Sequence, residues 1–207
     1  MFPWLHLNVT PKGDIYPCCS NDYTKPYGNT KEITLKQAFN SEQMKQLRLD
    51  MLNERKNDIC SFCYKHEEAG PYSFRNYSKE QFAKHFDSIV PTTQEDGTVE
   101  DFKMRYFDIR FSNICNFKCR TCGSEFSSQW GYEMNKHFVK GHPIVIHADE
   151  SGNLLNEVLE LDTFKLSKCM KERKWPPEII DMLKEFASEE KTRRIYINRK
   201  YGSNFFS

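Results

Sequence analysis

Apolar and polar residues alternate in two short runs near the start of the chain, WLHLNV at residues 4–9 and DIYPCC at residues 14–19. Alternation with a period of two predicts β-strands. The turn-forming sequence TPKG at residues 10–13 lies between the two runs, so we expect a β-hairpin. This hairpin would deliver Cys18 and Cys19 at the end of its second strand.

The residues that follow have a helical pattern. Thr34 and Gln37 have the spacing of a capping box, which marks the start of a helix. Apolar residues then recur at near-helical intervals, at Leu35, Phe39, Met44, Leu47, Met51 and Leu52. The pattern predicts one long helix, or two helices broken near residues 40–41, leading directly to Cys60 and Cys63.

A polar stretch separates the two halves of the chain. Before it, Ser78 and Gln81 have capping spacing and predict a short helix that continues through Phe86. The stretch itself, PTTQEDGTVED at residues 91–101, is rich in turn-forming residues. We interpret it as a linker between two domains.

The second half opens with a predicted strand, MRYFDIRF at residues 104–111, in which one face is formed by Phe107, Ile109 and Phe111. A loop with three cysteines comes next. Ser124 can then cap a helix whose apolar residues recur at every fourth position and are interpreted as core, namely Trp130, Met134 and Phe138. Further on, residues 143–147 and 193–197 have strand patterns, and residues 154–161 and 176–191 have helical ones.

Charge and hydropathy exclude several classes of partner. Thirty Lys and Arg residues balance 29 Asp and Glu residues, so we expect neither nucleic acid nor an anionic membrane as a partner. No apolar run reaches the roughly 18–20 residues that span a bilayer. The first residues lack the features of a signal peptide, and we expect a cytoplasmic protein.

The eight cysteines change this picture most. Thiols stay reduced in the cytoplasm, where clustered cysteines indicate metal or redox chemistry rather than disulfides. All but one of them are clustered, as the pair Cys18–Cys19, the Cys-x2-Cys of Cys60 and Cys63, and the three-cysteine loop. Cys169 stands alone and is interpreted as an ordinary thiol.

The three-cysteine loop, CNFKCRTC, carries Cys115, Cys119 and Cys122. Three thiolates at this spacing can hold three irons of a [4Fe–4S] cluster and leave the fourth iron open to a small molecule. The alternatives are a zinc site, completed by His137, His142 or a cysteine of the first half, and thiols without a metal.

With the preceding MRYFDIRFSNI, this loop resembles the defining motif of radical S-adenosylmethionine (radical SAM) proteins. The resemblance implies that S-adenosylmethionine binds the open iron and is reductively cleaved to a 5′-deoxyadenosyl radical, which acts on a substrate. Many members have an aromatic residue before the third cysteine, close to the adenine. Here Thr121 holds that cofactor-binding position, so adenine packing would rely on the backbone or on other side chains.

The earlier cysteines, Cys18, Cys19, Cys60 and Cys63, are enough for a zinc site or an auxiliary iron–sulfur cluster. Adjacent cysteines rarely both bind one iron, so we expect one of the pair to be a spectator, with His66 as a candidate substitute ligand. The strings FPWLHLNVTPKGDIYPCC and CSFCYKHEEAG resemble the SPASM/twitch auxiliary domains that accompany many radical SAM enzymes. The chain resembles a group of phage-like and environmental twitch proteins over residues 1 to about 140.

These features together predict an α/β protein. We expect a small α+β cysteine-rich auxiliary domain at residues 1–90, a linker at 91–101, and an incomplete radical SAM (β/α) partial barrel at 102–207 with a divergent tail from about residue 160. The sequence has no Gly-Gly pair for the amino-group-binding segment of a full barrel. Whether the chain is a catalytically active radical SAM enzyme is therefore left open. The alternatives are a non-catalytic iron–sulfur electron-transfer module and a zinc-stabilised interaction domain.

The resemblance also implies partners. The substrate is unknown, with a peptide or protein as the expected class, and the electron donor would be a flavodoxin or a ferredoxin.

Overall fold

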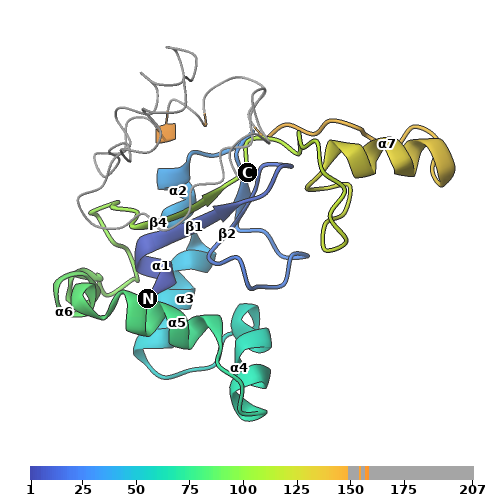
Figure 1. Ribbon diagram of the computed structural model, residues 1–207. Coiled ribbons are helices and arrows are strands. Elements are labelled where there is room, and N and C mark those ends of the chain that lie inside the picture. Colours follow the sequence, from blue (N-terminus) through green and yellow to red (C-terminus); the bar gives the residue numbers. More distant parts are fainter. Residues whose placement is uncertain (149–153, 155–156, 159–207) are drawn as a thin grey trace, which may run out of the picture.

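The computed structural model describes residues 1–148, 154, 157 and 158 of the 207-residue chain. Within this part, helices surround a small mixed sheet of four strands (Figure 1). The strand order is β3-β2-β1-β4, with β1 at His6–Val9, β2 at Asp14–Tyr16, β3 at Gly28–Asn29 and β4 at Tyr106–Ile109. The described part is thus a mixed α+β structure, and a partial barrel is not seen in it.

The predicted hairpin is confirmed. Strands β1 and β2 are antiparallel, with Asn8 opposite Tyr16. The turn between them closes on the backbone hydrogen bond from Gly13 to the carbonyl of Thr10, 2.9 Å long. Gly13 has φ +88°, a conformation that favours glycine because it has no Cβ. The strand prediction was wrong for Trp4 and Leu5, which belong to helix α1 (Phe2–Leu5), a short helix with a proline in its first turn.

One sheet contains strands from both sides of the segment that we interpret as a linker. Strand β4 lies parallel to β1, with Leu7 opposite Phe107 and Val9 opposite Ile109. Residues on both sides of 91–101 therefore share one sheet. The segment itself is partly packed against the core, because Val99 is fully buried and its amide donates to the side chain of Asn40 over 3.1 Å. The predicted domain limits remain a prediction.

The helical pattern of residues 34–56 forms two helices, α2 (Leu35–Phe39) and α3 (Glu42–Leu52). Thr34 and Gln37 form the predicted capping box. The break falls at the predicted place because Asn40 is the C-cap of α2, and Ser41 caps α3 by accepting from the amide of Met44. The two faces of the sheet carry different side chains. The strand pairing places apolar residues on one face, namely Leu7, Val9, Ile15 and Ile109. It places polar or aromatic residues on the other, namely His6, Asn8, Tyr16 and Asp108.

A second group of helices follows the Cys60 region. It consists of η1 (Asp58–Cys60), α4 (Ser61–Glu68), α5 (Phe74–Gln81), η2 (Ala83–His85), α6 (Phe86–Ile89) and η3 (Val90–Thr92). The prediction of a cap at Ser78 was wrong. Ser73 caps α5 by accepting from the amide of Asn76, whereas Ser78 lies inside that helix and bonds back to the carbonyl of Arg75.

The three-cysteine loop leaves the end of β4 and leads into α7 (Ser128–His137), as predicted. The predicted cap was wrong, because α7 begins after Ser127 rather than Ser124. Figure 1 shows α7 extending away from the sheet. The expected core stripe is also wrong, because Trp130 and Met134 are only half-buried and Phe138 is 74% exposed. The buried residues of α7 are Ser128 and Gly131, and an added Cβ at Gly131 would lie 2.8 Å from the carbonyl oxygen of Ile144.

The remaining predictions concern the last third of the chain. Residues 143–147 do not form a strand, although His147 makes an isolated antiparallel bridge with Ser112. Most of 154–161, and all of 176–191 and 193–197, lie outside the described residues, as does Cys169. Among the described residues, no helix is both long and apolar enough to cross a membrane.

Candidate metal centres

Three of the four N-terminal cysteines meet at one place. Cys18 follows β2, Cys60 immediately precedes α4, and Cys63 lies in the first turn of that helix. All three line a small cavity of about 30 Å³ beneath α1 and α3. The hairpin and the start of α4 thus bring together residues that lie about forty positions apart in the sequence.

The end of α3 fixes the position of Cys60. Asn57 caps the short helix η1 through its side chain, and its carbonyl accepts from the amide of Cys60 over 3.0 Å. The same side chain donates to the carboxylate of Asp50 in α3 over 2.7 Å. One asparagine therefore ties the Cys60 backbone to the last turns of α3, and no cysteine pattern in the sequence indicated it.

Two of these thiols, those of Cys18 and Cys60, have a raised pKa. Burial raises the pKa of the Cys60 thiol to about 11, and the nearby Cys63 adds to the shift. The pKa of Cys18 is also well above its usual range, because its thiol donates a hydrogen bond to Cys19 and is shielded from water. Metal ligation requires thiolates, and a bound cation stabilises them. The donor set, three sulfurs around one cavity, fits the thiolate ligands of an iron–sulfur cluster.

Cys19 has a different environment. It does not line the cavity that Cys18 shares with Cys60 and Cys63. Its pKa is lowered, first by the hydrogen bond from Cys18, while Asp108 and Arg110 on and beyond β4 also act on it electrostatically. The two adjacent cysteines therefore face different surroundings, which the sequence did not reveal.

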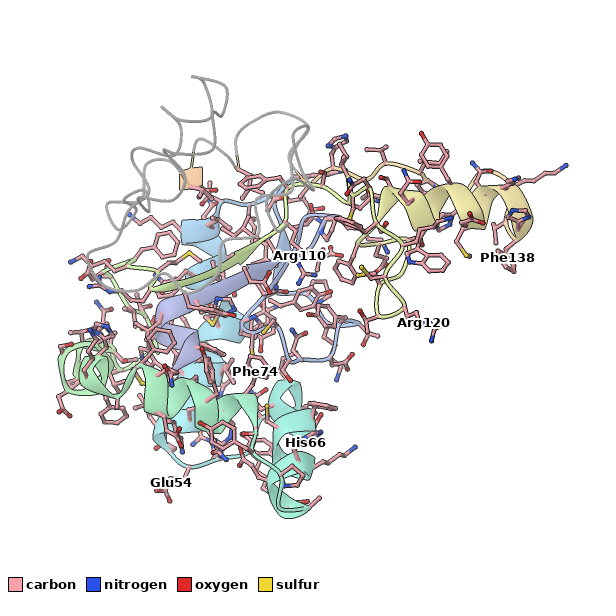
Figure 2. The ribbon with its side chains drawn as sticks, in the orientation of Figure 1. Glu54, His66, Phe74, Arg110, Arg120 and Phe138 are labelled. Carbon is pink, nitrogen blue, oxygen red and sulfur yellow. The ribbon has the colours of Figure 1, made fainter. Side chains whose placement is uncertain are left out.

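The second cysteine set lies in the loop after β4. Cys115 and Cys122 are half-buried and Cys119 is exposed. Figure 2 shows Arg120, which follows Cys119, at the outer edge of this loop. The backbone turns back on itself between the last two cysteines, with the amide of Cys122 donating to the carbonyl of Cys119 over 3.1 Å.

Helix α7 holds the backbone of this loop. The hydroxyl of Ser128 accepts from the amide of Cys115 over 3.2 Å and donates to its carbonyl over 3.1 Å. The indole of Trp130 donates to the carbonyl of Cys119 over 3.0 Å. Sequence reasoning missed Ser128 as a positioning residue; the pair Ser127–Ser128 ahead of an apolar helix was the available signal.

Asn113 closes the base of the loop. Its side chain is fully buried, donates to the carbonyls of Ser124 and Ile144 over 2.8 and 3.1 Å, and accepts from the amide of Ile146 over 2.8 Å. The loop is therefore anchored at its base, while its cysteines remain accessible to a cofactor.

The other predicted site residues lie elsewhere. Thr121 is exposed on the three-cysteine loop. His137 pairs with Glu133 across 3.5 Å on α7, and His66 stacks on Phe62 of its own helix with ring centroids 4.5 Å apart. Within the described residues, no three His, Cys, Asp or Glu side chains are close enough to hold a single metal ion. A [4Fe–4S] cluster, by contrast, needs thiolates further apart, because four irons lie between them.

Comparison with known protein families found a match for the N-terminal part of the chain. Residues 1–64 match the family model of SPASM, an iron–sulfur cluster-binding domain. The match supports a SPASM/twitch-like domain in this segment. The match includes the hairpin, α2 and α3, and it contains Cys18, Cys19, Cys60 and Cys63. Comparisons with curated proteins and with solved structures found no match.

The match supports iron–sulfur cluster binding by residues 1–64. Typically SPASM domains are auxiliary to radical SAM enzymes, and the match ends before β4 and the three-cysteine loop. The ligands themselves, and any role of Cys115, Cys119 and Cys122, belong to the proposal below.

Proposed function

We propose that this chain binds two iron–sulfur clusters and belongs functionally with the radical SAM proteins. An auxiliary cluster is held by cysteines of the SPASM domain, and a [4Fe–4S] cluster is held by Cys115, Cys119 and Cys122. One observation carries the proposal: the three-cysteine loop leaves a strand that pairs in parallel with β1, the first strand of the SPASM domain.

The position of the loop suits a small-molecule ligand. It follows the carboxyl end of β4, and in parallel sheets ligands bind at the carboxyl ends of strands. Ser128 and Asn113 hold the backbone on either side, so the three thiols sit on a fixed frame. When bound there, a [4Fe–4S] cluster with one open iron supplies S-adenosylmethionine chelation and its reductive cleavage to a 5′-deoxyadenosyl radical.

Within the SPASM domain, we assign Cys18, Cys60 and Cys63 to the auxiliary cluster. They share one cavity, and Cys60 is the N-cap of α4, whose unpaired first-turn amides would stabilise an anionic cluster. Cys19 is left out of this set because it does not line that cavity.

The chemistry implies partners and a compartment. A reduced cluster needs an electron donor, for which a flavodoxin or a ferredoxin is the proposed class, and the substrate is proposed to be a peptide or protein. Reduced thiols also fit the cytoplasm.

A second candidate function is a non-catalytic electron-transfer module. The absence of any Gly-Gly pair in the sequence favours it, because the amino-group-binding segment of radical SAM barrels is then missing. Both candidates share the two clusters and differ only in S-adenosylmethionine cleavage.

Anaerobic reconstitution with iron and sulfide tests the proposal. Two clusters are expected, and the Cys115→Ala, Cys119→Ala, Cys122→Ala variant should lose about four irons per chain. Adding S-adenosylmethionine and dithionite to the loaded wild-type chain should then release 5′-deoxyadenosine. Two clusters without this product would establish the electron-transfer module, and zinc without iron would overturn both.

A further inference from the structure

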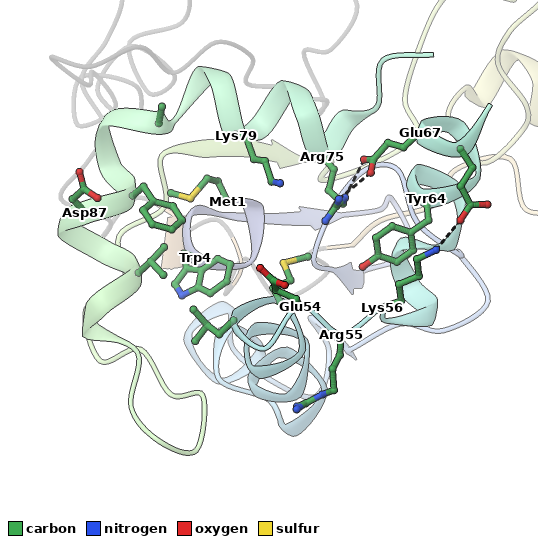
Figure 3. A pocket seen from close by; sticks show the side chains of 16 residues that line it. Met1, Trp4, Glu54, Arg55, Lys56, Tyr64, Glu67, Arg75, Lys79 and Asp87 are labelled. Carbon is green, nitrogen blue, oxygen red and sulfur yellow. Dashed lines mark hydrogen bonds and ion pairs between the residues drawn. The ribbon is translucent and has the colours of Figure 1, made fainter. Parts of the chain in front are cut away.

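A large pocket lies among the helices on one side of the SPASM domain, away from the three-cysteine loop. Its volume is about 1050 Å³, and it lies between the end of α3 and the helices α4, α5 and α6 (Figure 3). We call it the helical pocket and define it by Met1, Trp4, Met51, Glu54, Arg75 and Lys79. Nothing in the iron–sulfur chemistry above uses it.

The inner surface of the helical pocket is apolar. Met1, Trp4 and Met51 lie there, and Trp4 is held in place because its indole donates to the hydroxyl of Thr93 over 2.8 Å. An indole fixed by its polar atom leaves its ring face as an apolar contact surface. Methionine side chains beside it adapt to varied shapes. This apolar inner surface can therefore accept apolar side chains of different shapes.

The charged walls are neutralised in part. Arg75 pairs with Glu67 at 2.9 Å, and Lys56 pairs with Glu68 at 2.7 Å, as the dashed lines in Figure 3 mark. These four side chains therefore carry no net charge toward a ligand. They leave the specificity of the helical pocket to the remaining groups.

Four other charged side chains line the pocket: Asp87, Arg55 (which pairs with Asp50), and the oppositely charged Lys79 and Glu54. Lys79 on α5 and Glu54 after α3 reach into it from facing walls in Figure 3. Neither has an ion pair or a hydrogen bond from its side chain in the described part of the chain. A ligand with an anionic group near Lys79 and a cationic group near Glu54 would match both.

The backbone at Glu54 is unusual. Its φ of +56° is the sole positive value among the described residues other than glycine. It occupies the position after the C-cap of α3, where its amide donates to Met51 and the amide of Arg55 donates to Asp50, a Schellman arrangement that normally selects glycine. A glutamate there strains the backbone, because its Cβ is crowded in this conformation. A ligand-binding role for Glu54 would explain why a glutamate, rather than a glycine, occupies this position.

The helical pocket also adjoins the auxiliary site. Met1, Met51 and Arg75 line both the pocket and the cavity of Cys18, Cys60 and Cys63. An occupant would thus be separated from the cysteines by a single layer of side chains. This places the pocket at the SPASM domain rather than on an unrelated surface.

We propose that the helical pocket binds an extended peptide segment of a partner protein, with an apolar residue between an acidic and a basic one. The volume slightly exceeds the roughly 300–1,000 Å³ of small-molecule sites, which suits several residues. The apolar residue contacts Trp4, the acidic one pairs with Lys79 and the basic one with Glu54. This binding does not depend on S-adenosylmethionine cleavage.

Fluorescence polarisation on the anaerobically purified full chain tests the proposal. The probes are labelled, end-blocked hexapeptides with two central leucines and flanking charges: Lys and Glu in both orders, two Glu, or two Lys. One mixed-charge peptide should bind most tightly. Lys79→Glu should shift the preference to the peptide with two Lys by about tenfold, because like charges then repel the Glu probe. The exposed Lys140→Glu variant serves as a control and should bind as wild type.

Glu54→Gly provides a test that misfolding cannot imitate. It should raise the free energy of unfolding while weakening the mixed-charge peptide several-fold, whereas a merely structural Glu54 would leave binding unchanged. The proposal is overturned if no probe binds at millimolar concentration, or if Lys79→Glu and Glu54→Gly leave the order of affinities unaltered. Neither result bears on whether the chain releases 5′-deoxyadenosine.

Discussion

The guanidinium of Arg48 donates a 3.0 Å hydrogen bond to the carbonyl of Gly97, which joins α3 to the segment between the two cysteine-bearing halves. Arg48 is fully buried and also donates to Asn40 and to the carbonyls of Pro3 and Phe39. One side chain therefore connects α1, α2, α3 and the 91–101 segment, although all its partners are neutral.

Replacing Arg48 should destabilise the whole fold. Arg48→Lys keeps the charge but cannot serve four separate acceptors, so we expect a loss of about 2–4 kcal/mol in the free energy of unfolding. Arg55→Lys is the matched control, because Arg55 is exposed and pairs only with Asp50; its effect should stay within about 0.5 kcal/mol. Urea denaturation measures both. Equal effects would mean that the buried network contributes little.

Gly97→Ala tests whether the 91–101 segment is packed. An added Cβ would lie 2.5 Å from the carbonyl oxygen of Lys45, and φ is +88°. We expect a loss of about 2–3 kcal/mol from strain and overpacking together. Gly70→Ala is the control, since Gly70 has φ +93° with no atom within 4 Å of the added Cβ. It should cost only the backbone strain, and equal losses would indicate that the contact with Lys45 is unimportant.

The two adjacent cysteines should differ in iron binding. Cys18→Ala should remove the auxiliary cluster, because Cys18 shares a cavity with Cys60 and Cys63. Cys19→Ala should retain it, because Cys19 does not line that cavity. Iron and sulfide analysis after reconstitution separates the two, and EPR spectra of the reduced proteins show which cluster is lost. Loss of iron in the Cys19 variant alone would reverse the assignment.

Ser128→Ala should weaken the loop cluster without unfolding the chain. The hydroxyl holds both the amide and the carbonyl of Cys115, and residues that position metal ligands commonly affect metal affinity by tenfold or more. We expect a chelator to remove iron from that cluster roughly tenfold faster. Ser88→Ala is the control, because its hydroxyl bonds only to the carbonyl of His85. An unchanged rate of iron removal would show that the Ser128 hydroxyl has no role in holding the cluster.

Stability should fall in mild acid because of His6. Burial lowers the pKa of this fully buried ring to about 4, against 6.5 when it is exposed. The unfolded chain therefore binds a proton that the folded chain rejects. The contribution of neutral His6 is complete above pH 6.5 and is lost as the pH falls toward 4, by up to about 3 kcal/mol.

A comparison with His6→Gln isolates this effect from the titration of carboxylates. The difference in unfolding free energy between the two proteins should change between pH 6.5 and 4, measured at equal cluster loading. His66→Gln is the control, because that ring is only half-buried. A constant difference across this range would show that His6 has the same pKa in the folded and unfolded chains.

Local features of this protein followed from the sequence. The turn at Gly13, the capping box of Thr34 and Gln37, and the helix break at Ser41 depend on neighbouring residues, so their prediction succeeded. The cysteine spacing indicated metal chemistry, and the SPASM match supports it for residues 1–64. The predicted N-caps at Ser78 and Ser124 were wrong, because nearby serines, Ser73 and Ser127, occupy the N-cap positions.

Long-range pairing decided the rest. The parallel register of β1 with β4 joins residues about 100 positions apart, and no local pattern encodes it. The same is true of the separate environments of Cys18 and Cys19, the Arg48 network and the helical pocket, which all arise where distant segments pack together. The sequence by itself determined which residues could bind a metal, because ligand chemistry is a property of the side chain. Only the tertiary structure decided which of them share a site, because that depends on how the sheet brings its loops together.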